Sequence, residues 1–187
     1  MVSILDLWLP ILLSSVGVFI VSSIVHMALP MHKSDYAGLE HEDQILDSMR
    51  NIGVTQGEYM FPHADSMQEA YSPEMIEKFN RGPVGIMTIW PNGQMNMGKA
   101  LGQWFGLIVV LSIFAGYCAS MAFGTGASGM DVFRMTFMVA FTGYGTNSIQ
   151  NSIWKGQRWS VAGKFLFDGV LYATTTAVLF AWMWPAA

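Results

Sequence analysis

The sequence predicts an all-α integral membrane protein, in which four transmembrane helices carry one polar insert between the first and second spans. Two observations predict this class. Hydrophobic residues make up 52% of the 187 residues and charged residues only 12%, whereas a soluble domain carries roughly 25% charge. The apolar residues also gather in four runs, and about 20 residues at 1.5 Å each suffice to cross the hydrocarbon core of a bilayer.

The four runs divide the chain into three parts. Residues 1–30 hold the first span, residues 31–100 form the insert, and residues 101–187 hold the second, third and fourth spans. The runs are Leu7–Leu29, Gly102–Phe123, Met130–Ile153 and Val161–Trp184. The third run is the most polar, since its second half is rich in amide and hydroxyl side chains. Only a helix that faces other helices can carry such groups across lipid.

The insert is predicted to contain short helices and one extended segment. Residues 41–53 (HEDQILDSMRNIG) place apolar side chains at helical spacing and predict an amphipathic helix that ends at glycine. The stretch SPEMIEKFNRG predicts a second helix, because it opens with Ser and Pro and closes with Gly. We expect the intervening GEYMFPHAD to be irregular. Residues 86–90 (IMTIW) should be extended before a turn at 91–93 (PNG).

The distribution of Lys and Arg sets the predicted orientation. In a four-span protein, the insert and the connection between the third and fourth runs share one side of the membrane. That side carries Lys33, Arg50, Lys78, Arg81, Lys99, Lys155 and Arg158. The opposite side has Arg134 alone. Since basic residues are retained on the cytoplasmic side, we expect the insert to be cytoplasmic and both termini to lie outside the cytoplasm.

Asp168 lies about two turns into the fourth run, where a carboxylate is costly unless protein, water or a partner shields it from lipid. Lys164, four residues earlier, is expected to pair with it. A short connection makes the third and fourth runs antiparallel neighbours, which brings polar side chains of the third run to the same depth. These side chains are Thr146, Asn147, Gln150 and Asn151. Two interpretations stay open: hydrogen bonds that only fix the bundle, and an ion or proton pathway or ligand pocket.

A second polar cluster, HMALPMH, ends the first run. Two imidazoles and two thioethers come from His26, Met27, Met31 and His32. This donor set suits Cu(I), so copper or haem handling is one hypothesis. In the competing interpretation, Met fills apolar gaps and His lies at the level of the lipid headgroups. We predict no cofactor and keep copper or haem as the alternative.

No motif in the chain names a reaction. His63 and Asp65 have no nucleophile beside them and form no triad. The glycine-rich Gly124–Met130 lacks the Lys of a phosphate loop. The single Cys118 excludes a disulfide within the chain, and the formal net charge of −4 argues against a nucleic-acid partner. We therefore favour a protein that is not an enzyme.

Four stretches of the chain, RGPVGIMTIWPNG, NMGKALGQWF, NSIWKGQRWS and FDGVLYATTTAVLFAWMWP, carry a resemblance. They look like those of an uncharacterised group of small bacterial membrane proteins. The resemblance implies a four-span protein of the bacterial inner membrane. It implies no activity, cofactor or catalytic residue.

Three functions are consistent with the sequence. The lack of a reaction motif, together with small residues such as Gly102 and Gly106 on the second span, favours an accessory or assembly subunit. Its partners would be lipid and either other membrane subunits or a second copy of the chain. The first alternative is a small transporter or ion or proton pathway built on Asp168. The second alternative is the copper or haem handling described above.

Overall fold

The structure, a computed structural model, describes residues 2–187. The chain forms two compact units, and each is described by itself. The first unit, the bundle, comprises residues 2–35, Asn96–Ser152 and Gln157–Ala187. The second unit, the insert unit, comprises Tyr36–Met95 and Ile153–Gly156.

Three helical segments are long and apolar enough to cross a membrane. They are Ile4–Ala28, Met97–Ala122 and Trp159–Trp182, with 25, 26 and 24 residues and mean hydropathies of 2.2, 2.0 and 1.4. At about 1.5 Å per residue each exceeds the roughly 30 Å hydrocarbon core of a bilayer. The chain is therefore a multi-pass membrane protein, as the first, second and fourth apolar runs predict.

The first span changes its helical type along its length. It begins as a 3-10 turn, Ile4–Leu7, continues as α1, Trp8–Ser23, and ends in a π-helical turn, Ile24–Ala28. Leu29 is extended, with φ −88° and ψ 143°, because the residue before a proline is disfavoured in a helix. A second 3-10 turn, Pro30–Ser34, follows.

The third apolar run, predicted as one span, forms two helices. The first is α6, Gly129–Gly145, and the second is α7, Asn147–Trp154. The break at Thr146 falls where the run becomes polar, just after two glycines that favour helix weakly. The run is not among the three segments that hydropathy and length qualify as spans.

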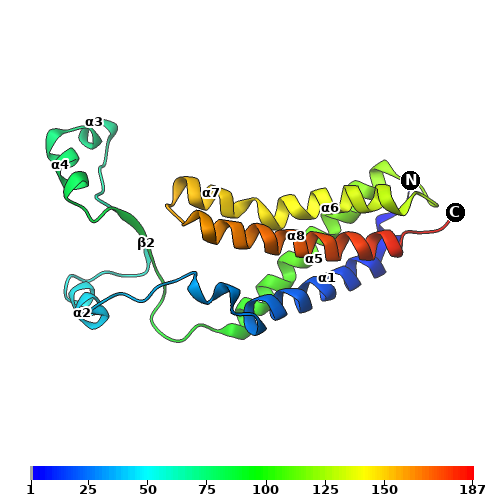
Figure 1. Cartoon of the computed structure of the whole chain (residues 1–187), viewed down its shortest axis with the longest axis horizontal. Helices are drawn as coiled ribbons and strands as arrows, with labels where there is room; N and C mark the ends of the chain where they lie inside the picture. Colours follow the sequence, from blue (N-terminus) through cyan, green and yellow to red (C-terminus); the bar gives the residue numbers. More distant parts are fainter. Residues whose placement is uncertain (1) are drawn as a thin grey trace. The chain divides into compact units, whose positions relative to one another are not determined.

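The bundle is a ring of four helical columns (Figure 1). Its members are α1, α5 (Met97–Ala122), α6 with α7, and α8 (Trp159–Trp182), and each column packs on two others, in the order α1, α5, α6, α8 and back to α1. Neighbouring columns run antiparallel. We call the end where α1 finishes and α8 begins the insert end. The other end, where both chain termini lie, is the terminal end.

Hydrogen bonds between side chains fix the register of α1 against α5. The Ser14 hydroxyl donates to Ser112 Oγ over 3.2 Å, and the indole N–H of Trp104 donates to Ser22 Oγ over 2.9 Å. All four partners lie on facing sides of the two helices. Such bonds stabilise membrane bundles modestly, by about 0.6 kcal/mol each.

Helices α6 and α8 approach most closely at a pair of glycines. A Cβ built on Gly169 would lie only 2.7 Å from the Cα of Gly145. Small residues allow such backbone contact between helices in membranes. Farther toward the insert end, the hydroxyl of Ser148 faces the carbonyl of Ala162 at 3.5 Å.

Buried side chains in the bundle form two clusters. The cluster at the terminal end is apolar and contains Val2, Leu7, Ala119, Val132, Phe180 and Trp184. The cluster toward the insert end contains Val18, Ile108 and Tyr172, with Trp104 and Tyr144 packed on it. The site described below lies beyond this second cluster.

The insert unit contains three helices and a two-stranded antiparallel sheet. Its elements are α2 (Glu42–Asn51), β1 (Gly57–Phe61), α3 (Met67–Ala70), α4 (Pro73–Arg81) and β2 (Gly85–Ile89). In the sheet, Gly57 pairs with Ile89 and Phe61 with Gly85. As predicted, the Ser72 hydroxyl caps α4 by accepting from the N–H of Met75.

Three predictions for the insert are confirmed and one is wrong. Helices α2 and α4 and the extended segment at β2 lie where the sequence places them. The stretch GEYMFPHAD is not irregular, since its first half is β1. Its alternation of half-buried and exposed residues depends on a partner strand far along the chain, which a local pattern does not reveal.

Candidate cation site

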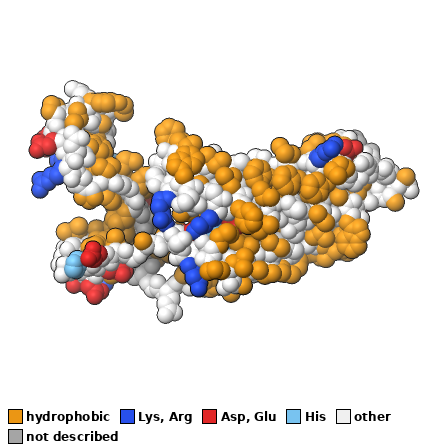
Figure 2. Space-filling view, in the orientation of Figure 1, with side chains coloured by type: hydrophobic (Ala, Val, Ile, Leu, Met, Phe, Trp, Pro, Cys, Tyr) orange, Lys and Arg blue, Asp and Glu red, His pale blue; other side chains and the backbone are white. Residues whose placement is uncertain are grey.

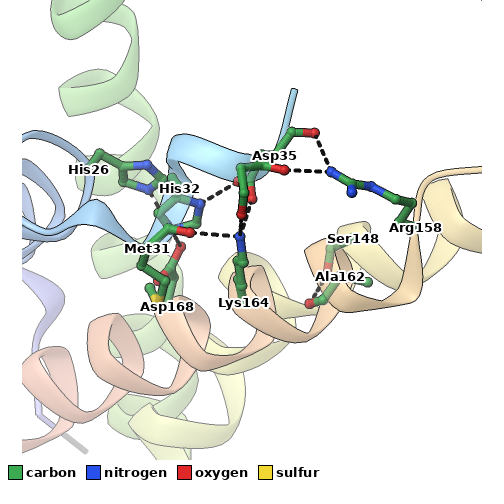
Figure 3. A network of polar contacts seen from close by, with 10 residues as sticks. His26, Met31, His32, Asp35, Ser148, Arg158, Ala162, Lys164 and Asp168 are labelled. Atoms are coloured by element: carbon green, nitrogen blue, oxygen red, sulfur yellow. Dashed lines mark hydrogen bonds and ion pairs between the residues drawn. The ribbon is translucent and has the colours of Figure 1, made fainter. Parts of the chain in front are cut away.

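Asp168 occupies α8 near the insert end and is 1% exposed. Its carboxylate faces the end of the first span (Figure 3). Its Oδ2 lies 3.0 Å from Nε2 of His32 and 3.5 Å from Nε2 of His26. The two imidazole rings stack with centroids 4.2 Å apart. Two histidines from one element and a carboxylate from another therefore converge on one point inside the bundle.

The irregular end of the first span makes this convergence possible. In a continuous α-helix, residues 26 and 32 would lie about 240° apart around the axis and point to different sides. Here His26 belongs to the π-helical turn and His32 to the 3-10 turn that follows Leu29. The change of helix type and the extended Leu29 between them bring both imidazoles to Asp168. Single π-helical turns are frequent at functional sites.

A strap of basic side chains holds the His32 turn against α8. The Lys164 ammonium group donates to Asp35 Oδ1 and to the Met31 carbonyl, both at 2.6 Å, and to Ser34 Oγ at 2.9 Å. The guanidinium of Arg158 donates to the backbone carbonyls of Ser34 and Asp35. Both basic residues belong to the start of α8, so the ligand-bearing turn is fixed to the helix that carries Asp168.

The predicted ion pair between Lys164 and Asp168 is wrong. Lys164 pairs with Asp35 instead. Side chains on an α-helix lean toward its N-terminus. The ammonium group therefore extends toward the insert end, away from Asp168 one turn later. Asp168 is left to the two histidines.

Asp35 contacts the ring nitrogen of His32 that does not face Asp168. Its Oδ2 lies 2.6 Å from Nδ1 of His32, and its side chain is 5% exposed. Burial alone would raise the pKa of Asp35, but hydrogen bonds from Lys164 and His32 outweigh burial and hold that pKa below its ordinary value of 3.8. Asp35 is therefore ionised at neutral pH and orients the ring of His32.

Asp168 is short of hydrogen bonds. Among residues 2–187, neither of its carboxylate oxygens has a hydrogen-bond partner, and Nε2 of His32 has none either. The 3.0 Å contact between His32 and Asp168 is close enough for an ion pair, but it does not meet the geometry of a hydrogen bond. A buried carboxylate without such bonds is strongly unfavourable. The arrangement calls for a proton, a water molecule or a metal ion between these groups.

The amide side chains of the third run do not take part. At the depth of Asp168, α8 turns Gly169 toward α6 and Asp168 toward the end of the first span. The Thr146 hydroxyl donates to the carbonyl of Thr142 within its own column. The other three predicted partners, Asn147, Gln150 and Asn151, form no side-chain hydrogen bond to Asp168 in the part of the chain that the structure describes. The predicted depth agrees with the structure, but the predicted face of α8 is wrong.

The HMALPMH cluster divides into two halves. Its histidines join Asp168 in one group of potential metal ligands. Met27 is 79% exposed, and Met31 enters the network through its backbone carbonyl. Sequence reasoning treated this cluster and Asp168 as separate features. It missed Asp35, whose only signal was an acidic residue three positions after His32.

An aromatic layer lies below the site within the bundle. The rings of Trp104, Tyr144 and Tyr172 meet edge to face, with centroids 5.6 to 6.2 Å apart. Tyr172 follows Asp168 by one helical turn. The hydroxyls of Tyr144 and Tyr172 are buried and lack a hydrogen-bond partner among the described residues. Polar atoms that lack partners thus continue from the site into the bundle.

Comparison of the chain with known protein families, curated proteins and solved structures finds no match. The donors of the site are two imidazole nitrogens and one buried carboxylate, backed by Asp35 and Lys164. Imidazole and carboxylate groups are both known ligands of divalent metal ions.

Proposed function

We propose that this chain is a four-span protein of the bacterial inner membrane that binds a cation at Asp168, in the manner of a small transporter or ion pathway. One observation carries the proposal. Asp168 is 1% exposed, faces two imidazoles and has no hydrogen-bond partner for either oxygen among residues 2–187. A bound cation would compensate this buried charge, and ionisable residues inside membrane bundles commonly mark ion and proton pathways.

The course of the chain supports a fourth crossing. Helices α5 and α8 both run from the insert end to the terminal end (Figure 1). The chain must return between them, and α6 with α7 provides residues 129–154 for the return. At about 1.5 Å per residue this column is about 39 Å long. Within this column, α6 packs on α5 and α8. In α7, Ser148 and Ser152 are buried, whereas Asn147 and Gln150 are exposed.

The charge distribution supports a cytoplasmic insert end. Lys and Arg side chains gather at the insert end on the face of the bundle in Figure 2, and hydrophobic side chains cover its middle. Lys164 and Arg158, the two basic residues of the strap over the site, also lie at this end, because α8 begins there. By the positive-inside rule, the insert end faces the cytoplasm and both termini lie outside.

The exposure of the site residues supports access from the insert end. The side chain of His26 is 39% exposed, whereas those of His32 and Asp168 are 11% and 2% exposed. In the other direction, Leu7, Val132 and Phe180 are fully buried in the apolar cluster. In this proposal an ion reaches Asp168 from the side of His26, and the apolar cluster closes the terminal end.

Ion flux into proteoliposomes tests this function. Vesicles with trapped fluorescent reporters for H⁺, Na⁺ or Zn²⁺ would contain the wild type, Asp168→Asn or Asp131→Asn. We expect the wild type to move at least one of these ions, Asp168→Asn to lose that flux, and Asp131→Asn to keep it. Asp131 is a matched control because it is a carboxylate at the start of α6 that pairs with Arg134 on the surface. Equal flux for the wild type and Asp168→Asn, or no flux above empty vesicles, would refute the proposal.

An accessory subunit is the second candidate, and an open face of α5 favours it. Gly98, Gly102 and Gly106 lie four residues apart, and a Cβ built on Gly102 or Gly106 would meet no atom within 4 Å. Such spacing lets a second transmembrane helix approach closely. We expect Gly102→Leu to abolish any association along α5, measured by native mass spectrometry from mild detergent. If the complex is equally abundant with Gly102→Leu, this face of α5 is not the surface through which the chain associates.

A further inference from the structure

We infer that the cation is a divalent transition-metal ion of the zinc class, bound by His26, His32 and Asp168. The inference rests on the proposed function, since it names the ion that the Asp168 site takes. It differs from copper handling through methionine, because the ligands are two imidazoles and a carboxylate from two separate elements.

The spacing of the three donors fits one metal ion. The ligand atoms of His26, His32 and Asp168 all lie within 4.8 Å of one another. Two ligands of a tetrahedral zinc ion, each about 2.0–2.1 Å from the metal, lie about 3.3 Å apart. The observed separations of 3.0 and 3.5 Å from Asp168 Oδ2 to the two imidazoles bracket that value. The two rings stack with their planes 23° apart, so one imidazole must turn for both Nε2 atoms to point at the same ion.

The surroundings of His32 match the second layer of a metal site. A metal-binding histidine generally donates its other ring N–H to a carboxylate, which fixes the tautomer and makes the free nitrogen a better ligand. Asp35 lies 2.6 Å from Nδ1 of His32 and leaves Nε2 facing Asp168. Lys164 in turn holds Asp35 from the other side. His32 is therefore oriented for metal binding through Nε2.

The atoms that lack partners are the ones that a metal would engage. Both carboxylate oxygens of Asp168 and Nε2 of His32 are buried and have no hydrogen bond in residues 2–187. In an ordinary polar core these atoms would be paired with one another or with backbone groups. Nδ1 of His32 and both oxygens of Asp35, by contrast, have hydrogen-bond partners. The unpartnered atoms of His32 and Asp168 are therefore those that a metal ion could engage.

The type of donor selects the class of ion. Imidazole with carboxylate suits zinc and its neighbours, whereas Cu(I) prefers sulfur and Mg²⁺ and Ca²⁺ prefer six or more oxygens. The chain has a single cysteine, Cys118, on α5. Three protein ligands leave a fourth position on a tetrahedral ion, unlike the closed four-ligand sites that serve only structure. An incomplete set of ligands suits an ion that must leave again.

Zinc binding by the full-length protein in mild detergent tests the inference. After treatment with a chelator, titration calorimetry with zinc chloride should show one ion per wild-type chain. Asp35→Asn should weaken binding by about 10–100-fold, the usual effect of losing a second-layer partner. Asp168→Asn and His32→Gln should weaken it more, since they remove ligands. Cobalt(II) should give the intense visible absorption of a tetrahedral ion and lose it on addition of zinc.

His63→Gln is the matched control. His63 also lies beside an aspartate, at 3.6 Å from Asp65, but both side chains are exposed and no third ligand joins them among the described residues. This variant should bind zinc as the wild type does. Circular dichroism and gel filtration of each variant establish that it is folded, and the cobalt spectrum of the wild type needs no variant at all.

Two outcomes would overturn the inference: a wild type that binds no zinc at micromolar concentration, and zinc binding that Asp168→Asn and His32→Gln leave unchanged. If zinc fails to bind but H⁺ or Na⁺ flux still depends on Asp168, the metal assignment fails and the cation pathway stands. If zinc binds at this site but no ion crosses the vesicle membrane, the metal assignment stands and the transport function fails.

Discussion

At the terminal end of the bundle, Leu7, Val132 and Phe180 are fully buried in one apolar cluster. At the insert end, the same columns bury Asp168 against His32 and leave three of their polar atoms without hydrogen bonds in the described chain. Lipid tails are as apolar as leucine, so packing and not the hydrophobic effect holds membrane helices together. The terminal end is built to hold the helices together, and the insert end maintains an unfavourable arrangement that a ligand would relieve.

This difference gives separable expectations for the two ends. Changes at the terminal end should lower stability and leave cation binding intact at temperatures where the protein is folded. Changes to the proposed ligands at the insert end should remove binding and affect stability little. The following variants test that separation, in order of decreasing expected effect on the free energy of unfolding.

Phe180→Ala should have the largest effect on stability. Phe180 is the largest fully buried side chain of the bundle, and truncation of such a residue costs about 3–5 kcal/mol. Thermal unfolding in detergent, followed by circular dichroism, measures the loss. Phe114→Ala is the control, because Phe114 is 56% exposed on α5. Similar melting temperatures for the two variants would mean that the terminal cluster is not the main source of stability.

Gly169→Ala should come next, because it acts where α6 and α8 touch. The new methyl group would lie 2.7 Å from the Cα of Gly145, and overpacking of this kind costs about 1–3 kcal/mol. Gly163→Ala on the same helix meets nothing within 4 Å and should be neutral or slightly stabilising. The same thermal unfolding measures both variants. If Gly169→Ala and Gly163→Ala have the same melting temperature, α6 and α8 do not approach each other at Gly169 as closely as the structure shows.

Ser22→Ala should cost less, about 1 kcal/mol, because it deprives the Trp104 indole N–H of its acceptor. Ser23→Ala is a close control. Both serines donate to the carbonyl of Phe19, but only Ser22 also accepts from Trp104. A shift of Trp104 fluorescence should accompany Ser22→Ala and be absent in Ser23→Ala. An unchanged fluorescence spectrum in both variants would mean that the Trp104 indole does not donate to Ser22.

Asp168→Asn should affect the stability of the metal-free protein least, or even raise it. The amide keeps the shape of the side chain and removes a buried charge that has no hydrogen bond among residues 2–187. Added zinc should raise the melting temperature of the wild type and leave that of Asp168→Asn unchanged. A large loss of stability in the metal-free variant would show that Asp168 holds the bundle together.

Much of the fold could be predicted from the sequence, because its signals are local. Apolar runs define three spans, and Ser72 and Gly82 define the ends of α4. Strand β1 could not be predicted, since five residues of alternating burial depend on β2 for pairing. The break at Thr146 was not predicted, although it follows two glycines and falls where the run becomes polar.

For the site, the sequence identified Asp168, His26 and His32 as candidate residues but did not show that they contact one another. Burial of Asp168 follows from the cost of a charge in lipid. Its pairing with His26 and His32 depends on the change from α- to π- to 3-10 helix before and after Leu29. Helical periodicity in the sequence assumes a single helix type and therefore does not predict that change. Asp35 joins the site through its contacts with His32 and Lys164, which its distance along the chain from Lys164 does not reveal.

Zinc K-edge X-ray absorption of the zinc-loaded wild type measures the ligands of the ion itself. A zinc ion bound by His26, His32 and Asp168 should show nitrogen and oxygen ligands at about 2.0–2.1 Å, with the outer-shell scattering of two imidazoles and no sulfur. His32→Gln should remove one imidazole from that pattern. Sulfur at about 2.3 Å, or a spectrum of a fully hydrated ion, would contradict a cation site made by His26, His32 and Asp168.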